Sequence, residues 1–146
     1  FAAGRAGERF AVRNSGASVV IEGCGSNGCE YMTGGVAVIL GRIGANFGAG
    51  MTGGMAYLYD REGLARDYVN AETLILCPVT QPHWEAQLRE LIERHARETG
   101  SRRAEEILQN WAEERQNFLQ VCPKEMLPHL KYPIAEVEDL AAVPAE

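Results

Sequence analysis

The sequence feature that most constrains the fold is a repeat of 18 to 19 residues within the first 60 positions. Its three copies start at Gly7, Gly25 and Gly44, and the tetrapeptide at 32–35 returns unchanged at 51–54. The aligned columns are Gly7/Gly25/Gly44, Ser15/Thr33/Thr52, Gly16/Gly34/Gly53 and Ile21/Ile39/Leu58. A βαβ unit needs about 30 residues, and a propeller blade needs about 40. The shorter period therefore predicts coils of a β-solenoid, stacked about 4.8 Å apart.

Each copy contains a run of β-forming residues and a shorter piece, around residues 11–13 or its counterpart, that we expect to be extended. Glycine columns are expected at the corners of such coils, where the backbone approaches its neighbour closely. The Val, Ile and Leu columns are expected to stack inside as the core. The predicted fold class is therefore mainly β, a single-stranded β-helix, with an α-helical appendage.

The appendage follows a sharp change of composition near residue 60. Fourteen of the 16 glycines precede it, whereas all six prolines and 26 of the 34 charged residues follow it. We expect three segments: the coils at 1–60, a connection with helices packed on the solenoid at 61–126, and an acidic tail at 127–146. The tail assignment rests on its last eleven residues, which carry four acidic residues and no basic ones.

Two amphipathic helices are expected in the second segment, after a short extended stretch at 73–79. Pro82 is typical of a first helical turn, and Gly100 followed by Ser101 is typical of a helix end and a new N-cap. The helix stripes contain Trp84, Leu88, Leu91, Ile92 and His95 in the first helix, and Ala104, Ile107, Leu108, Trp111, Arg115 and Phe118 in the second. The sequence Val121-Cys122-Pro123 is expected to stop the second helix. Such stripes must pack on each other and on the end or flank of the solenoid.

Two nucleotide-binding motifs are rejected. The sequence from Gly23 to Gly28 spells GxGxxG after a β run, but a β run follows it instead of a helix, and no acidic residue occurs between Glu30 and Asp60. A dinucleotide site requires both the helix and the acidic residue. A P-loop is excluded because Lys124 is the first lysine.

No catalytic, cofactor-binding or metal-binding residue is predicted. His95 lies on an apolar stripe and is expected to be a packing histidine; His83 is expected in solvent, and His129 in a loop. The four cysteines, Cys24, Cys29, Cys77 and Cys122, lack the two close pairs of a zinc site. Tyr57 and Tyr59 are expected to pack under the helices.

The formal net charge of −6 argues against nucleic acid or an anionic membrane surface as a partner. The longest uncharged run, residues 43–59, contains five glycines and is too short for a membrane helix. Free cysteines are typical of a reducing compartment, so we expect a cytoplasmic protein. The chain starts at Phe1 without a methionine, and we expect it to be a fragment of a longer protein.

The repeat and the helical region resemble the C-terminal domain of the large subunit of glutamate synthase. The matching strings are Gly7-Glu8-Arg9-Phe10-Ala11-Val12-Arg13-Asn14-Ser15-Gly16-Ala17, Glu22-Gly23, Gly28-Cys29-Glu30-Tyr31-Met32-Thr33-Gly34-Gly35, Asn46-Phe47, Ala49-Gly50-Met51, Gly53-Gly54, Ala56-Tyr57, Leu91-Ile92-Glu93-Arg94-His95, Thr99-Gly100-Ser101 and Ile107-Leu108. The resemblance covers residues 1 to about 126 and implies a right-handed β-helix with a G-x-x-G-x-x-x-G repeat.

The same resemblance implies a function. The whole subunit would convert glutamine, 2-oxoglutarate and reductant to two glutamates, using FMN and a 3Fe–4S cluster on another domain. Cys24 and Cys29 do not match the cysteine motif of that cluster. The glutaminase nucleophile of the family is an N-terminal cysteine, whereas this chain begins with Phe1. This segment would brace the preceding domains and contact ferredoxin or a pyridine-nucleotide-dependent small subunit. The alternative is a stand-alone β-helix subunit of another oxidoreductase complex, similar to one in formylmethanofuran dehydrogenase.

Overall fold

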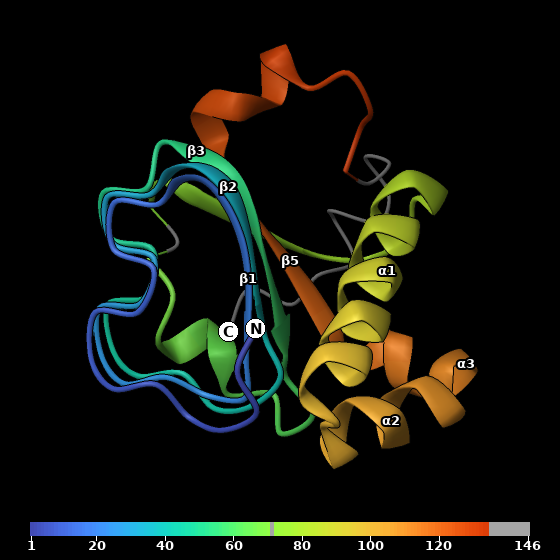
Figure 1. The fold of residues 1–146 in the computed structure, drawn as a ribbon. Helices are drawn as coiled ribbons and strands as arrows, with labels where there is room; N and C mark the ends of the chain where they lie inside the picture. The colour runs from blue at the N-terminus through green and yellow to red at the C-terminus, as the bar shows by residue number, and fades with distance from the viewer. Residues whose placement is uncertain (71, 135–146) are drawn as a thin grey trace.

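The computed structural model describes residues 1–70 and 72–134 and shows a mixed α/β chain built on one open sheet (Figure 1). The sheet has five strands in the order β1-β2-β3-β5-β4. Its strands are β1 (Ser15–Ile21), β2 (Thr33–Ile39), β3 (Gly53–Tyr59), β4 (Leu74–Pro78) and β5 (Phe118–Pro123). Most of the expected acidic tail at 127–146 lies outside the described residues.

The strands β1, β2 and β3 are parallel, and each is followed by a loop that returns the chain to the start of the next strand. Seen along the stack, the three turns have nearly the same outline (Figure 1). Ile21 pairs with Ile39, and Ile39 pairs with Leu58, as the repeat predicted. At the strand starts the register is shifted, because Ser15 lies opposite Gly34 and Thr33 opposite Gly53. The Ser/Thr column is therefore displaced by one residue.

The piece around residues 11–13 is not extended, which corrects the sequence prediction. Every second residue there, and at the counterparts in the next two turns, has a positive φ: Arg9, Ala11 and Arg13; Asn27, Cys29 and Tyr31; Asn46, Gly48 and Gly50. Alternation of this kind lets successive turns bond to each other. The Arg9 amide donates to the Ser26 carbonyl at 2.8 Å, and the Asn27 amide donates to the Ala45 carbonyl at 2.8 Å.

The glycine columns lie where one turn touches the backbone of the turn before it. A Cβ atom at Gly34 would lie 2.6 Å from the Ser15 carbonyl oxygen, and one at Gly53 would lie 2.1 Å from the Thr33 carbonyl oxygen. Neither glycine has a positive φ, so the requirement is close approach alone. At Gly16, the first member of the same column, a Cβ would meet nothing within 4 Å.

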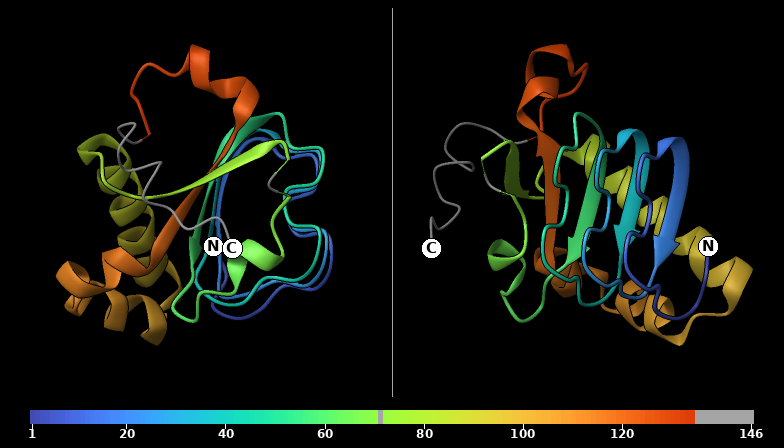
Figure 2. Two further views of the ribbon diagram at one scale, coloured as in Figure 1. Left: turned by 180° about the vertical axis from the view of Figure 1, so that it is seen from behind. Right: turned by 90° about the vertical axis from the view of Figure 1, so that its left-hand side faces the viewer.

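The sheet separates two apolar cores. One core fills the inside of the turns and contains Ile21, Ile39, Leu58, Met32 and Phe47, as the aliphatic columns predicted. The other lies between the opposite face of the sheet and the helices, where Val20, Val38 and Tyr57 meet α1. Figure 2 shows the α-helices confined to that one face. The helices are α1 (Pro82–Thr99), α2 (Arg102–Gln109) and α3 (Trp111–Glu114), and the short 3-10 helices are η1 (Ala65–Asp67), η2 (Arg115–Asn117) and η3 (Lys124–His129).

Helix α1 begins and ends where the sequence predicted. Pro82 is its first residue, and Gly100 follows its last residue with a φ of 67°. Ser101 then caps α2, because its hydroxyl accepts a hydrogen bond from the Ala104 amide at 3.1 Å. The expected stripe faces the sheet, since Trp84, Leu88, Leu91, Ile92 and His95 are the buried residues of α1.

The second helix is shorter than the sequence predicted. It breaks at Asn110, and the chain becomes a strand at Phe118. The residues Val121-Cys122-Pro123 therefore end β5 and do not stop a helix. Strand β5 runs antiparallel to β3, with Ala56 opposite Val121, and also antiparallel to β4.

The glycine column supplies a stability test with an internal control. We expect Gly53→Ala to lower the free energy of unfolding by about 1–3 kcal/mol, because the added methyl group overlaps the Thr33 carbonyl. Gly16→Ala on the same column should change it by less than about 0.5 kcal/mol, because its Cβ meets open space. Urea denaturation of the chain measures both. Equal losses for the two variants would contradict the stacking account.

Candidate functional site

The first turn of the stack forms an exposed edge of the sheet. Strand β1 pairs only with β2, and its first four residues are exposed, whereas β3 at the other side of the stack is almost wholly buried. The second half of β1 is covered by the N-terminal residues. The Ala2 amide donates to the Val20 carbonyl at 3.1 Å, and the Glu22 amide donates to the Gly4 carbonyl at 2.9 Å. Figure 2 shows the N-terminus beside β1 at this end.

This edge is shaped like the surfaces on which the later turns already stack. At Gly7 and Gly16 a Cβ would meet nothing within 4 Å, but at their counterparts Gly25 and Gly34 it would meet the preceding turn within 3.1 Å or less. The first turn thus carries small residues at the same places without a neighbour against them. We define the stacking edge as Gly7, Gly16 and the exposed start of β1, residues 15–18.

The opposite end of the stack is closed by the chain itself. The outer edge of β3 pairs with β5, and Phe47 in the third turn bridges to Val69. The Phe47 amide donates to the Tyr68 carbonyl at 2.9 Å. An unpaired sheet edge favours association with another strand. The stack can therefore be extended at the β1 end and not at the β3 end.

A buried polar cluster fastens the helices to the end of β1. The His95 Nε2 lies 3.0 Å from Glu22 Oε2, and the Ser101 hydroxyl donates to the same oxygen at 2.5 Å. Burial raises the pKa of Glu22, but the Ser101 and His95 hydrogen bonds and the charges of His95 and Arg103 lower it more, so the net pKa lies below its ordinary value. His95 is fully buried, as its place on the stripe predicted.

This cluster has the residue types of a hydrolase triad but not its geometry. In a nucleophile–base pair the hydroxyl bonds to the imidazole. Here the hydroxyl and the imidazole bind one carboxylate oxygen, and the serine is also the N-cap of α2. The cluster is a structural junction of β1, α1 and α2.

The four cysteines are buried. Burial raises the pKa of Cys24 and of Cys122 to about 11, and it raises the pKa of Cys29 further. Burial of Cys24, Cys29 and Cys122 thus disfavours the thiolate form in which cysteine binds iron–sulfur clusters and zinc. The cysteines do not fit an iron–sulfur cluster, and the described residues contain no group of three or more His, Cys, Asp or Glu that could hold a metal ion.

The two tyrosines of β3 join the sheet to the helices, as expected. The Tyr57 hydroxyl donates to Gln87 Oε1 at 2.7 Å, and burial raises its pKa. The Tyr59 hydroxyl donates to Glu114, and burial together with that carboxylate raises its pKa to about 12. Sequence reasoning missed both partners, because the period of a helix does not reveal which polar residue faces a given strand.

The remaining histidines lie outside this junction. His83 is exposed, as expected, and stacks on Tyr132 with ring centroids 3.9 Å apart. His129 ends η3 and is also exposed. The GxGxxG sequence from Gly23 to Gly28 leads into β2 and not into a helix, as the sequence analysis required.

Comparisons with known proteins identify the relatives of this arrangement. The sequence model of the family described as GXGXG motif matches residues 1–124. The chain is 63% identical over 134 residues to the glutamate synthase [NADPH] large chain of Azospirillum brasilense; this alignment covers 92% of this chain and 9% of that protein. It is 53% identical over 123 residues to the ferredoxin-dependent glutamate synthase of Pyropia yezoensis, covering 84% of this chain and 8% of that one. It is 46% identical over 139 residues to the glutamate synthase [NADH] of Schizosaccharomyces pombe, covering 95% and 7%.

The chain thus spans less than a tenth of the length of each of these relatives. In the part of the chain that the structure describes, no helix combines the length and the apolar character needed to cross a membrane.

The Glu22 junction predicts a dependence of stability on pH. Since the folded pKa of Glu22 is below the ordinary 4.5, its contribution is fully present above pH 4.5 and is lost as the pH falls through the lowered value. Glu22→Gln should cost about 1–3 kcal/mol at pH 7 and should show a weaker loss of stability in acid. Urea denaturation between pH 3 and 7 measures this, with the exposed Glu105→Gln as the control. The idea fails if Glu22→Gln and the unsubstituted chain lose stability in parallel.

Proposed function

Because this chain belongs to the GXGXG motif family, we propose that it is a structural segment of a glutamate synthase large subunit. In this proposal the three turns are the last coils of a right-handed β-helix, and they lie C-terminal to the catalytic domains. The observation that carries the proposal is the stacking edge. Its glycines provide the space that another turn needs, and no described residue fills it.

The proposed segment divides into three parts. Residues 1–60 are the final coils, residues 61–126 are the connection and the helices that pack on them, and residues 127–146 are an acidic tail. The second part contributes β5 and β4 to the sheet, so it also closes the end of the coils. Closure at one end and exposure at the other support a terminal position in a longer stack.

The proposed chemistry belongs to the whole subunit. It converts glutamine, 2-oxoglutarate and reductant to two glutamates, in a cytoplasmic enzyme that assimilates ammonia. FMN and the 3Fe–4S cluster are bound by other domains, consistent with the buried cysteines of this segment. The segment itself has no catalytic role and braces the preceding domains of the same subunit. Its further partner is ferredoxin or a pyridine-nucleotide-dependent small subunit.

A stand-alone β-helix subunit of another oxidoreductase is the less favoured alternative. The three relatives described above are glutamate synthases, and between 84% and 95% of this chain aligns with each of them. A stand-alone subunit would also have to protect the exposed start of β1, because an unpaired edge favours aggregation.

Gly16 tests the proposed stacking directly. In the isolated chain Gly16→Ala should be nearly neutral, but in the full-length protein it should destabilise this region as Gly53→Ala does, because a preceding turn then lies against it. Thermal unfolding and hydrogen exchange of β1 in both forms measure the difference. The control is Ala86→Ser, at an exposed position on α1. The exposed Gly63 would not serve, because its positive φ of 74° makes an alanine there strained. A Gly16→Ala substitution that stays neutral in the full-length protein would overturn the stacking proposal.

Activity measurements test the assignment of the chemistry. We expect no glutaminase or glutamate-forming activity from the isolated 146-residue chain. The full-length protein should form glutamate from glutamine and 2-oxoglutarate when reductant is supplied. Turnover by the isolated chain that persists through further purification would refute a purely structural role. Absence of glutamate formation by the full-length protein would refute its assignment as a glutamate synthase.

A further inference from the structure

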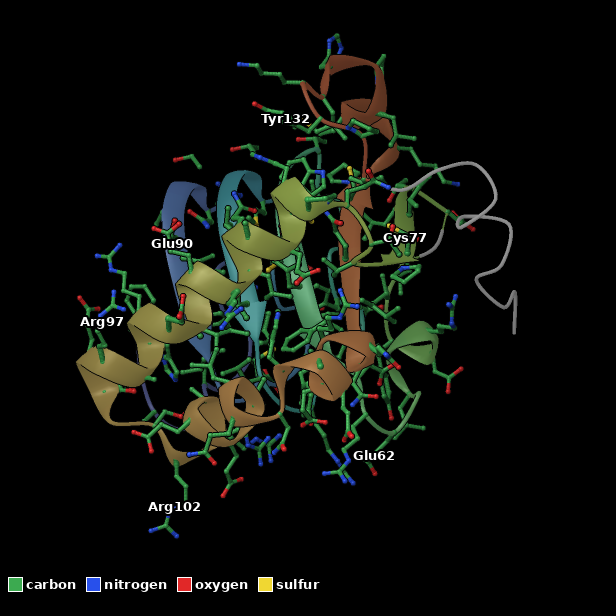
Figure 3. The ribbon with its side chains drawn as sticks, turned by 90° about the vertical axis from the view of Figure 1, so that its right-hand side faces the viewer. Glu62, Cys77, Glu90, Arg97, Arg102 and Tyr132 are labelled. Carbon is green, nitrogen blue, oxygen red and sulfur yellow. The ribbon has the colours of Figure 1, made fainter. Side chains whose placement is uncertain are left out.

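A cleft of about 500 Å³ lies at the carboxyl ends of the three parallel strands. It is lined by Glu22, Gly41 and Tyr59, which follow or end β1, β2 and β3, and by residues of α2. Residues 60–65 form the opposite rim, which includes Glu62. Figure 3 labels Glu62 near the lower ends of the strands, on the side where α2 and α3 lie. The cleft has the size of a small-molecule site.

Most acidic groups of the cleft are already bound within the chain. Asp60 Oδ1 accepts hydrogen bonds from the Leu64 and Ala65 amides at 2.9 and 3.1 Å. Glu62 pairs with Arg42 through two contacts of 3.1 Å. Glu22 belongs to the buried junction, and Glu114 binds Tyr59 and Asn117. Among the carboxylates that line the cleft, only Glu106 has no such bond within the described residues.

Three arginines of the cleft have donors to spare. Arg5 and Arg61 make no hydrogen bond or ion pair within residues 1–70 and 72–134, and Arg103 donates from Nη1 to the Leu40 carbonyl at 2.7 Å. Each guanidinium carries five N–H donors. The cleft therefore presents charged donors without partners, although its five carboxylates outnumber its four arginines.

Two glycines leave room for the guanidinium groups of Arg5 and Arg103 beside the strand ends. The Arg5 Nε lies 2.9 Å from the place of a Cβ at Gly23, and the Arg103 Nη1 lies 3.0 Å from that of a Cβ at Gly41. Larger residues there would displace both arginines from the cleft. Arg61 and Arg103 line the cleft together with Tyr59, and the charges of both arginines lower the pKa of the Tyr59 hydroxyl, against the larger effect of burial and Glu114.

We propose that this cleft binds a small polyvalent anion, a phosphate or a di- or tricarboxylate, through Arg5, Arg61 and Arg103. Arginine matches the paired oxygens of carboxylate and phosphate in geometry as well as charge. Glu106 opposes the anion, so its removal strengthens binding. The site is independent of the stacking edge, and neither proposal requires the other.

Arginine labelling in the full-length protein tests the site. Phenylglyoxal modification is followed by peptide mass spectrometry in phosphate, in citrate, and in chloride at matched ionic strength. Phosphate or citrate should slow the labelling of Arg5, Arg61 and Arg103 at least threefold. Arg97, exposed on the outer side of α1 (Figure 3), is the internal control and should be unchanged. Equal protection of Arg97, or no protection of the three, overturns the proposal.

Variants separate binding from general effects of charge. Arg61→Gln should abolish the protection of Arg5 and Arg103, Glu106→Gln should increase it, and Arg97→Gln should leave it unchanged. Unchanged thermal unfolding shows that each variant is folded. If the three arginines are already protected in chloride, a carboxylate of the surrounding protein occupies the cleft, and the small-anion proposal is wrong.

Discussion

The close approach of successive backbone turns is the constraint on which the rest of this structure depends. Parallel strands stack at about 4.8 Å, and here backbone hydrogen bonds also join the connecting loops of successive turns. At Gly34 and Gly53 the carbonyl of the preceding turn occupies the space in which a methyl group would stand. The glycine-rich composition of the first 60 residues is therefore a packing requirement.

The stacked turns and the helical region form one unit through the sheet. Strand β5 comes from the charged part of the chain, yet it pairs with β3 and contributes Val121 to the core inside the turns. Tyr57, Tyr59 and the Glu22 junction then tie α1, α2 and α3 to the other face. The change of composition near residue 60 thus marks a change of local structure, while the sheet continues across it.

The sequence predicted the features that depend on neighbouring residues or on the repeat. The register of Ile21, Ile39 and Leu58 follows from the period, and the ends of α1 follow from Pro82 and Gly100. The positive φ values at Ala11, Cys29 and Tyr31 could not be predicted, because these residue types disfavour that conformation and the bonds between turns impose it. Strand β5 was missed because Phe118 extends the helical stripe, whereas pairing with the outer edge of β3 decides its structure.

The site followed the same division between local and long-range information. His95 was correctly assigned to packing, but its partner Glu22 lies 73 residues away and only the fold brings the two together. The grouping of the cleft arginines could not be predicted for the same reason, since Arg5, Arg61 and Arg103 come from three separate segments. What the repeat does reveal is an asymmetry. The later members of the glycine column, Gly34 and Gly53, lie against a preceding turn, whereas a Cβ at the first member, Gly16, would meet open space; this asymmetry is what supports the stacking proposal.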